Sequence, residues 1–429
     1  MTWMVLGAGR SGIAAAKLLA WKGHNVVLAD SGPIPDSTKN KLPTSTVTFY
    51  EQDQREVLDQ RVSSGLILSP GIHSRHPYIN QAKKRGLPIL SEVDLALSYY
   101  DGVVISVTGT NGKSTTVAMA YHLLDTMGYK AALAGNIGTP PSEIITDCKK
   151  APEFMVLELS SYQLEQSNKI RSHATAILNL SPDHLARHGT MEQYLREKWK
   201  IVLMCPKSSH GLVDSKVMAM ASKLPQPTCP IELVEAEQAI AAVDPSLSGQ
   251  HEWHNRLNGY YASHLVAQVL QAPISSIIPH LSTFRGLSHR FEKVGTIKGA
   301  TVINDSKATN VDSTLVALSN LKKPATLLLG GQGKGESFVE VKKYRHHIKN
   351  LLIFGQDAPI ISEELKDMEP VQYTNLRTMM KALPKLFYRD QHPPDLIFSP
   401  GCASFDEFRN FEERGNFFKS EIKALLDPY

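Results

Sequence analysis

A glycine-rich loop beside a lysine is the strongest chemical signal in the chain. The apolar run from Val103 is followed by Val107-Thr108-Gly109-Thr110-Asn111-Gly112-Lys113-Ser114-Thr115. The backbone of such a loop can wrap triphosphate oxygens, while Lys113 adds a point charge at the β- and γ-phosphates and Ser114 can bind Mg²⁺. The loop is shorter than the strict G-x-x-x-x-G-K-[ST] form, because Val107 stands five residues before Gly112. We predict ATP binding; a plain glycine turn with a solvated lysine is the alternative.

A second glycine motif lies near the N-terminus. The segment Gly7-Ala8-Gly9-Arg10-Ser11-Gly12 follows an apolar run, 2–6, and precedes a helical pattern, 11–22, and Asp30 stands 21 positions after Gly9. This matches the dinucleotide fingerprint, in which glycines let the backbone approach a diphosphate and the acid accepts from a ribose or base. We predict a phosphate-bearing ligand, with a ligand-free tight turn as the alternative. A domain of about 90 residues lacks room for both halves of a full NAD fold, which disfavours nicotinamide chemistry.

Carboxylate and imidazole groups follow two further buried runs. Glu158 comes directly after the run 154–157, and Asp183-His184 follows the run 174–178. Ligands bind at the carboxyl ends of parallel strands, and Mg²⁺ prefers oxygen, so Glu158 is a candidate metal ligand. The alternatives are a helix-capping acid at Glu158 and a structural pair at Asp183-His184.

Lys198, on a predicted helix, is a candidate metal ligand only if its amine is modified. Tyr194, Lys198 and Ile201 recur at helical spacing, and a solvated helix residue is the ordinary interpretation of Lys198. A protonated amine cannot bind Mg²⁺. A neutral amine that takes up CO₂ becomes a carbamate, which could serve as an oxygen ligand for a second metal.

Polar clusters near the C-terminus have no metal or triad spacing. They comprise Leu327-Leu328-Leu329-Gly330-Gly331-Gln332-Gly333-Lys334-Gly335, Leu287-Ser288-His289-Arg290-Phe291-Glu292, Ile303-Asn304-Asp305-Ser306-Lys307-Ala308-Thr309-Asn310 and Ser399-Pro400-Gly401-Cys402-Ala403-Ser404-Phe405-Asp406. Taken separately, they are interpreted as a mobile turn, loops and caps.

The elements that carry these residues predict an α/β protein. Short apolar, β-branched runs alternate with helical patterns along the chain, which is typical of parallel sheets covered by helices. Predicted strands lie at 2–6, 25–29, 65–68, 86–90, 103–107, 154–157, 174–178, 301–303, 325–329, 351–354 and 396–398. We divide the chain into domains 1–90, 91–286 and 287–429; the stretch 206–250 gives no clear pattern.

Composition excludes several classes of protein. The chain has 429 residues, 42% apolar and 21% charged, which is typical of a globular protein of more than one domain. A net charge of +4 without a long basic block does not indicate nucleic-acid binding. The cysteines, Cys148, Cys205, Cys229 and Cys402, are widely spaced, which indicates a reducing compartment. We expect a cytoplasmic protein without signal peptide or membrane span.

Taken together, the segments resemble the Mur ligases of peptidoglycan synthesis over essentially the whole chain. The resemblance rests on the loop 108–115 and on Gly135-Asn136-Ile137-Gly138, Leu157-Glu158-Leu159-Ser160-Ser161-Tyr162-Gln163-Leu164-Glu165, Asp183-His184, Tyr194-x-x-x-Lys198, His254-Asn255-x-x-Asn258, His289-Arg290-Phe291-Glu292 and 304–310. Some of these are shared with folylpolyglutamate synthetases. The stretches 157–165, 304–310 and 399–406 point to the D-glutamate-adding member.

The resemblance implies a fold and a reaction. It implies an N-terminal Rossmann-like domain for the UDP part of the substrate, a central P-loop-type ATPase with a mainly parallel sheet, and a C-terminal Rossmann-like domain that closes over the site. ATP would phosphorylate the carboxylate of UDP-N-acetylmuramoyl-L-alanine, and the D-glutamate amine would attack the acyl phosphate through a tetrahedral intermediate. We expect a monomer.

The resemblance also implies residue roles. Lys113, His184 and Lys198 would be catalytic, Ser114 and Glu158 would bind one Mg²⁺, and His184 with carbamylated Lys198 would bind a second. ATP contacts would come from Gly109, Thr110, Asn111, Gly112, Lys113, Ser114, Thr115, Asn255, Asn258, Arg290, Asp305 and Lys307. UDP-substrate contacts would come from Arg10, Ser11, Asp30, Ser31, Ser69 and Asn136, and D-glutamate contacts from Thr309, Lys334, Ser404, Phe405 and Phe411.

The sequence departs from the family pattern at three places. Gln332 stands where an aspartate is frequent, and Phe405 where a leucine is common, which could tighten the D-glutamate pocket. The segment Gln250-His251-Glu252-Trp253 has the character of a small insertion before the asparagine motif.

Three rival functions stay open at this point. They are an NAD-linked dehydrogenase using the first glycine motif, a non-catalytic nucleotide-dependent assembly protein, and a related Mur or folylpolyglutamate-type ligase that adds another amino acid.

Overall fold

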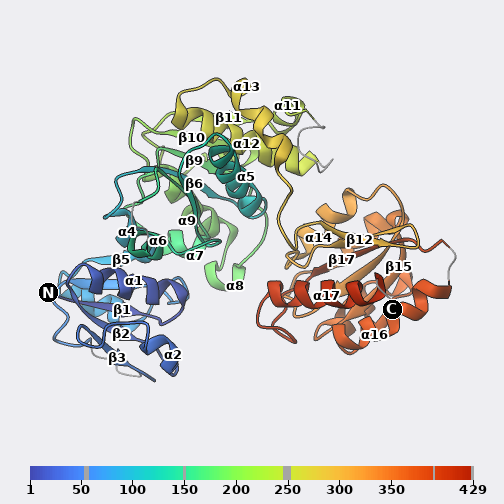
Figure 1. The fold of residues 1–429 in the computed structure, drawn as a ribbon, viewed down its shortest axis with the longest axis horizontal. Coiled ribbons are helices and arrows are strands. Elements are labelled where there is room, and N and C mark those ends of the chain that lie inside the picture. Colours follow the sequence, from blue (N-terminus) through green and yellow to red (C-terminus); the bar gives the residue numbers. More distant parts are fainter. Residues whose placement is uncertain (53–57, 148–150, 245–252, 390–391, 427–429) are drawn as a thin grey trace. The chain divides into compact units, whose positions relative to one another are not determined.

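The chain folds into two compact units, Met1–Arg285 and Gly286–Tyr429, which are treated separately below (Figure 1). The computed structural model describes residues 1–52, 58–147, 151–244, 253–389 and 392–426. In this described part, the first unit contains two β-sheets and the second unit contains one.

The N-terminal sheet is parallel, with the strand order β3-β2-β1-β4-β5. Its strands are apolar on both faces, as expected when helices cover a parallel sheet. The elements are β1 (Thr2–Leu6), α1 (Arg10–Trp21), β2 (Asn25–Ala29), α2 (Asp36–Lys39), β3 (Val47–Tyr50), β4 (Gly65–Leu68), α3 (Pro77–Lys84) and β5 (Ile89–Ser91).

The central sheet is also parallel, in the order β11-β10-β9-β6-β8-β7. Its elements are α4 (Glu92–Leu97), β6 (Val103–Thr108), α5 (Lys113–Thr126), β7 (Ala131–Gly135), α6 (Pro141–Asp147), β8 (Phe154–Glu158), α7 (Ser161–Gln166), β9 (Ala174–Ile177), α8 (Leu185–His188), α9 (Met191–Leu203), β10 (His210–Asp214), α10 (Ser215–Met220), β11 (Ile231–Val234), α11 (Ala236–Ala241), α12 (Trp253–Leu270), α13 (Ile274–Ile277) and the 3₁₀ helix η1 (Ile278–Thr283).

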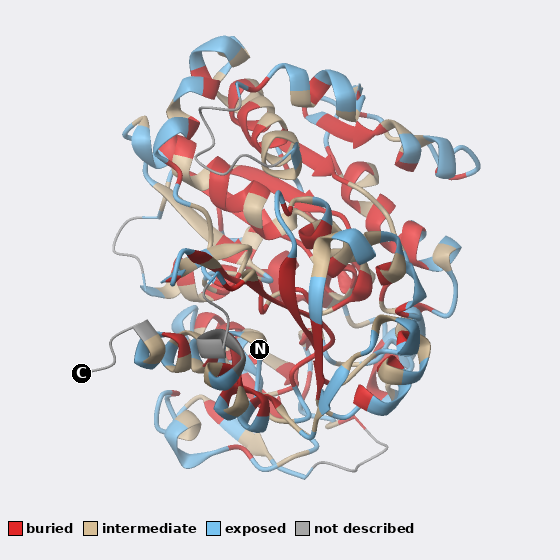
Figure 2. Ribbon diagram, turned by 90° about the vertical axis from the view of Figure 1, so that its right-hand side faces the viewer, coloured by how far each residue is buried: buried red, intermediate tan, exposed pale blue. Residues whose placement is uncertain are grey.

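One hydrophobic core joins these two sheets into a single unit. Val5 and Ile67 of the N-terminal sheet belong to the same buried cluster as Val104 and Met155 of the central sheet. Figure 2 shows the strands in the buried colour between helices whose outer faces are exposed. Because burial of this cluster depends on both sheets, the two phosphate-loop candidates are held on one framework.

The C-terminal sheet is mixed, in the order β12-β13-β17-β14-β15-β16, with β12 antiparallel to β13. Its elements are β12 (Glu292–Ile297), β13 (Ala300–Asn304), α14 (Val311–Ser319), β14 (Ala325–Gly330), η2 (Val339–His347), β15 (Ile348–Phe354), α15 (Ala358–Glu364), η3 (Lys366–Met368), β16 (Val371–Tyr373), α16 (Leu376–Arg389), β17 (Asp395–Gly401) and α17 (Phe411–Leu426).

The α/β class and the three-sheet architecture predicted from sequence are confirmed. Several strands escaped the sequence analysis, among them β3, β7, β12 and β16, together with β10 and β11 in the stretch that gave no clear pattern. The exact domain boundaries stay predictions.

No helix in the described ranges combines the length and apolar character needed to cross a membrane. Three of the four cysteines, Cys205, Cys229 and Cys402, are free and buried; Cys148 lies outside the described residues.

Candidate active site

The central glycine loop connects β6 to α5. Gly112 has a left-handed backbone, φ +83°, directly before the first residue of α5, which favours glycine there. Asn179 braces the loop, because its Oδ1 accepts from the backbone N–H groups of Thr110 at 3.1 Å and Asn111 at 2.8 Å. The N-terminus of a 14-residue helix thus follows a shaped loop, a common arrangement for binding phosphate.

Two lysines meet at one carbonyl oxygen of this loop. Lys113 Nζ donates to Gly109 O at 3.0 Å and to Thr110 O at 2.6 Å. Lys198 Nζ donates to the same Gly109 O at 2.6 Å. These lysines stand 85 positions apart in the sequence, and the fold brings both to the loop; their roles at phosphate and metal stay predictions.

Lys198 is not the solvated residue that its helical spacing ordinarily indicates. It is 1% exposed in α9, and its Nζ lies 4.6 Å from the centre of the Tyr194 ring. Burial, reinforced by the nearby charge of Lys113, lowers the pKa of Lys198 well below its ordinary value. The neutral amine is the form that reacts with CO₂, so this shift of the pKa favours the reactive form.

Glu158 supplies a carboxylate at the neighbouring strand end. It is 1% exposed; its Oε1 accepts from Asn136 Nδ2 at 2.6 Å, while its buried Oε2 has no hydrogen-bond partner among the described residues. An unpaired buried carboxylate oxygen is costly unless a cation or donor fills the place, so Glu158 fits a metal ligand. Asn136, a predicted UDP-substrate contact, therefore lies beside the candidate metal ligand Glu158.

His184 lies at the start of α8, with φ +56°. Its Nε2 is 3.3 Å from Asp183 Oδ2 and its Nδ1 is 3.2 Å from the Tyr162 hydroxyl. Each ring nitrogen has a partner, so binding a metal through either would require displacing one of them. No group of three or more His, Cys, Asp or Glu side chains within the described ranges could hold a metal ion. The metal sets predicted from sequence would therefore depend on Ser114, on phosphate oxygens and on a carbamate.

Asn255 and Asn258, which were predicted to contact ATP, lie on α12, which packs on α5. Asn258 Oδ1 accepts from Thr116 Oγ1 at 3.3 Å, and a Cβ added to Gly112 would meet this oxygen at 2.5 Å. Asn255 lies one turn earlier on the same helix. The helix begins at Trp253, and the rest of the predicted insertion, 250–252, lies outside the described residues.

The N-terminal glycine loop is shaped by an acid rather than a lysine. Asp30 Oδ2 accepts from Ala8 N at 2.6 Å and its Oδ1 from Gly32 N at 2.8 Å. Ser69 is buried, and its Oγ donates to Gly7 O at 2.9 Å. Of the remaining predicted contacts, Ser11 is half-buried, and Arg10 and Ser31 are exposed.

The predicted residues of the C-terminal unit lie on several segments, which include the loops that follow β13 and β17. Asp305 is buried and accepts from Ser399 Oγ at 2.8 Å and Phe291 N at 3.1 Å; burial raises its pKa to about 7. Lys307 Nζ lies 4.0 Å from the centre of the Phe411 ring. The other members differ in exposure: Ser404 is buried, Arg290, Thr309 and Phe411 are half-buried, and Lys334 and Phe405 are exposed.

The sequence analysis missed the residue that joins these two loops. Arg414 is 1% exposed in α17. Its guanidinium donates to Ser306 O at 2.7 Å and to Cys402 O at 3.0 Å. The only signal in the sequence is its place three residues after Phe411.

Two of the three departures from the family pattern also lie in the C-terminal unit. Gln332 pairs with Ala403 through backbone hydrogen bonds of 3.0 and 2.8 Å, and Phe405 is 69% exposed.

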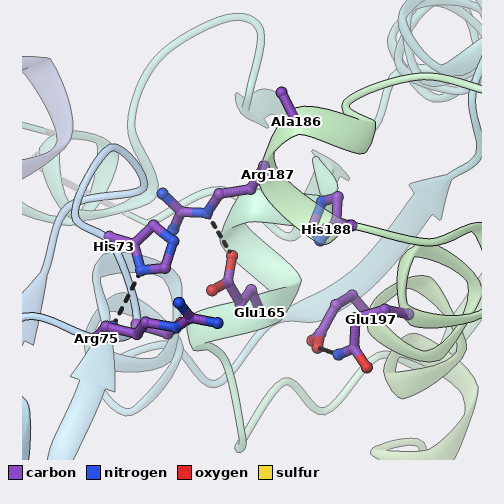
Figure 3. A pocket seen from close by; sticks show the side chains of 10 residues that line it. His73, Arg75, Glu165, Ala186, Arg187, His188 and Glu197 are labelled. Atoms are coloured by element: carbon purple, nitrogen blue, oxygen red, sulfur yellow. Dashed lines mark hydrogen bonds and ion pairs between the residues drawn. The ribbon is translucent and has the colours of Figure 1, made fainter.

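A polar cavity of about 530 Å³ borders the candidate site in the first unit. Figure 3 shows Arg187 directed toward Glu165 and His73 beside Arg75 at this cavity. Arg187 Nε donates to Glu165 Oε2 at 2.9 Å, and His188 Nε2 lies 2.9 Å from Ser161 Oγ. The cavity is therefore lined by residues that are already paired with one another, next to the helix that follows His184.

Comparisons with known proteins cover the whole chain. Residues 1–91 match the family described as Mur ligase MurD-like, N-terminal domain, residues 107–252 match the Mur ligase middle domain, and residues 289–398 match the Mur ligase, glutamate ligase domain. The UDP-N-acetylmuramoylalanine--D-glutamate ligase of Elusimicrobium minutum is 34% identical, covering 98% of this chain and 97% of that protein. Its namesake from Gloeobacter violaceus is 35% identical, covering 98% of each.

A solved structure agrees on the fold. The MurF ligase of Thermotoga maritima, crystallised in complex with ADP, has a TM-score of 0.63 at 15% sequence identity and covers 94% of this chain and 96% of that one. At this identity the likeness concerns the fold alone.

Proposed function

Because this chain belongs to the Mur ligase family, we propose that it joins D-glutamate to UDP-N-acetylmuramoyl-L-alanine at the expense of ATP, in the synthesis of peptidoglycan precursors. The observation that carries the proposal is full-length similarity, at 34–35% identity, to relatives named for this reaction. The two glycine loops support it, since one has a lysine, Lys113, that can bind a triphosphate and the other has an acid, Asp30, that can bind a ribose or base.

The reaction overcomes the poor electrophilicity of a carboxylate. The carboxylate of the L-alanine terminus attacks the γ-phosphorus of ATP, the bond to the β,γ-bridging oxygen breaks, and ADP leaves. The D-glutamate amine then attacks the acyl carbon, a tetrahedral intermediate forms, and inorganic phosphate leaves as the amide forms and the amine loses a proton. The acyl phosphate would hydrolyse in water, so the site must exclude water while it exists.

The central loop would hold ATP. Lys113 now donates to two loop carbonyl groups, and it would exchange these partners for γ-phosphate oxygens. Thr110, Asn111 and Thr115 would surround the phosphates, and Asn255 and Asn258 would contact the nucleotide from α12. Arg290, Asp305 and Lys307 would contribute from the C-terminal unit.

Glu158 and Ser114 would hold a first Mg²⁺, because Glu158 has a buried oxygen without a partner in the described part of the chain. His184 and a carbamate on Lys198 would hold a second. Bound Mg²⁺ would reduce the charge repulsion between the triphosphate and the incoming carboxylate. The buried Lys198 amine, with its lowered pKa, would form the carbamate by adding its nitrogen to CO₂ and releasing a proton.

The remaining residues would bind the two other substrates. Arg10, Ser11, Asp30, Ser31, Ser69 and Asn136 would contact the UDP and sugar portions. The exposed Lys334 would pair with a carboxylate of D-glutamate, whose other contacts would be Thr309, Ser404, Phe405 and Phe411.

A coupled ADP-release assay with each substrate omitted in turn tests the proposal. We expect ADP release only when ATP, UDP-N-acetylmuramoyl-L-alanine and D-glutamate are all present. ADP release that ignores the UDP substrate would contradict the proposal, and a panel of amino acids would detect a ligase with another specificity. Thermal stabilisation by NAD but not by the UDP substrate would favour a dehydrogenase.

We place the reaction in the cytoplasm. We also expect a monomer, which light scattering would test.

A further inference from the structure

A polar contact network connects the UDP-side loop to the edge of the central ATPase sheet. We propose that Gln166 and Arg187 are positioning residues that hold the turn Ser69–Ile72 on the central domain and so set the place of the UDP substrate relative to His184. This inference rests on the proposed function and adds residues to it. The two residues are called the Gln166–Arg187 clasp below.

The clasp binds the two carbonyl groups at the ends of one turn. The turn closes through Ile72 N, which donates to Ser69 O at 2.9 Å. The Gln166 side-chain amide donates to both carbonyl groups, at 3.1 Å to Ser69 O and 2.7 Å to Ile72 O. Arg187 Nη2 donates to the same Ile72 O at 2.8 Å. Three donors from α7 and α8 therefore converge on a turn that belongs to the N-terminal sheet.

The turn Ser69–Ile72 also holds the N-terminal glycine loop in place. Ser69 N donates to Leu6 O at 3.0 Å and its Oγ donates to Gly7 O at 2.9 Å. A Cβ added to Gly12 would meet Ser69 Oγ at 2.7 Å, so the fit between turn and loop is close. A displacement of the turn would consequently move the surface on which we place the UDP diphosphate.

Arg187 also contacts residues of the central domain near His184. Its Nε donates to Glu165 Oε2 at 2.9 Å, and both side chains are only 12–13% exposed (Figure 3). Its guanidinium lies 5.0 Å from the centre of the Tyr162 ring, whose hydroxyl is 3.2 Å from His184 Nδ1. The planar, multidentate guanidinium suits this role better than a lysine would. The clasp thus connects the UDP-side turn to the histidine through a few short contacts.

Kinetic constants for each substrate separate positioning from general stability. We expect Gln166→Glu and Arg187→Ala each to raise KM for the UDP substrate by about tenfold, because each removes side-chain hydrogen bonds that hold the carbonyl groups of the turn on the central domain. Gln166→Glu preserves size but cannot donate when ionised. KM for ATP and for D-glutamate should stay within about twofold of wild type, and Arg187→Lys should recover part of the lost affinity by supplying one donor.

Lys200→Ala is the matched control. Lys200 donates to Leu164 O at 3.2 Å and Glu165 O at 2.9 Å, so it supports the same helix, α7, without touching the turn. We expect its KM for the UDP substrate to equal that of wild type. Calorimetric titration of the UDP substrate into each folded variant, without ATP, should give the same order of affinities.

The outcomes are distinguishable. Wild-type protein that fails to release ADP with all substrates present refutes the proposed function, whatever the variants do. If wild type is active, a clasp variant in which all KM values shift together, or in which none shifts, overturns the positioning role. A selective rise in KM for the UDP substrate, absent in Lys200→Ala, supports it.

Discussion

The two glycine loops of the first unit share a plan and differ in the side chains that reach them. Both follow a parallel strand, contain a glycine at positive φ and precede a helix. The N-terminal loop is held by a carboxylate, since Asp30 accepts from Ala8 N. The central loop instead receives the side-chain nitrogen atoms of Lys113 and Lys198, which both donate to Gly109 O.

The difference teaches that the backbone plan alone does not select a ligand. Either loop offers the N-terminus of a helix to a phosphate. Lys113 would add positive charge at the triphosphate, whereas an acid favours hydroxyl and N–H donors of a nucleoside. The predictions below test this division.

The sharpest test removes the charge from the central loop. We expect Lys113→Ala to lower turnover on the order of a thousandfold or more, because it removes charge stabilisation at the transferred phosphate. Binding of the UDP substrate, followed by thermal shift, should stay near wild type. Equal loss of turnover and UDP-substrate binding would show that the two loops do not divide the substrates.

The second lysine should be nearly as important. We expect Lys198→Ala to reduce turnover by roughly a hundredfold or more, because loss of a metal ligand or its partner commonly costs that much. A short carboxylate such as formate should restore part of the activity if the carbamate supplies only oxygen atoms. Full activity of the variant would remove Lys198 from the mechanism; ¹³C-labelled CO₂ and NMR would detect the carbamate in wild type.

Substitution of Gly12, the closely packed glycine of the N-terminal loop, should lower the stability of the protein. A Cβ at Gly12 would meet Gly7 O at 1.8 Å, whereas a Cβ at Gly9 meets nothing within 4 Å. We expect Gly12→Ala to lower the free energy of unfolding by roughly 3 kcal/mol, and Gly9→Ala to change it by less than about 0.5 kcal/mol. Urea denaturation of both variants would check this; similar values would mean that the loop relaxes freely.

The smallest effect should come from the acid that shapes the same loop. We expect Asp30→Ala to raise KM for the UDP substrate by about tenfold, since Ala8 N and Gly32 N lose a charged acceptor. KM for ATP should not change. Asp36→Ala, which removes only an exposed ion-pair partner of Lys39, is the control, and a rise in KM for ATP after Asp30→Ala would contradict the division between the loops.

Much of the fold was predictable because its strands are short apolar runs that end in glycine or polar residues. The predicted ranges 2–6, 25–29 and 65–68 coincide with β1, β2 and β4. The exceptions have physical reasons. Strand β11 lies at a sheet edge and exposes Glu232 and Leu233, so it lacks the continuous apolar signal of a strand buried on both faces. Strand β12 is antiparallel and largely half-buried, which a search for parallel, buried runs passes over.

The sequence named candidate site residues but could not show their surroundings. The local spacing of the glycine motif is enough to identify Lys113 as a candidate. The burial of Lys198, in contrast, depends on the packing of α9 against the central sheet. The hydrogen bond from Asn136 to Glu158 is a further example, because no local spacing connects these two residues. Gln166, Arg187 and Arg414 act through contacts with distant backbone carbonyl groups, and no local pattern marks such residues.

The buried guanidinium of Arg414 has a consequence for inhibitor design. Since it ties the segments around Ser306 and Cys402 together, these segments should move as one rigid body whenever the C-terminal unit changes position. A compound that contacts both segments would therefore lose little affinity to the entropy cost of ordering them.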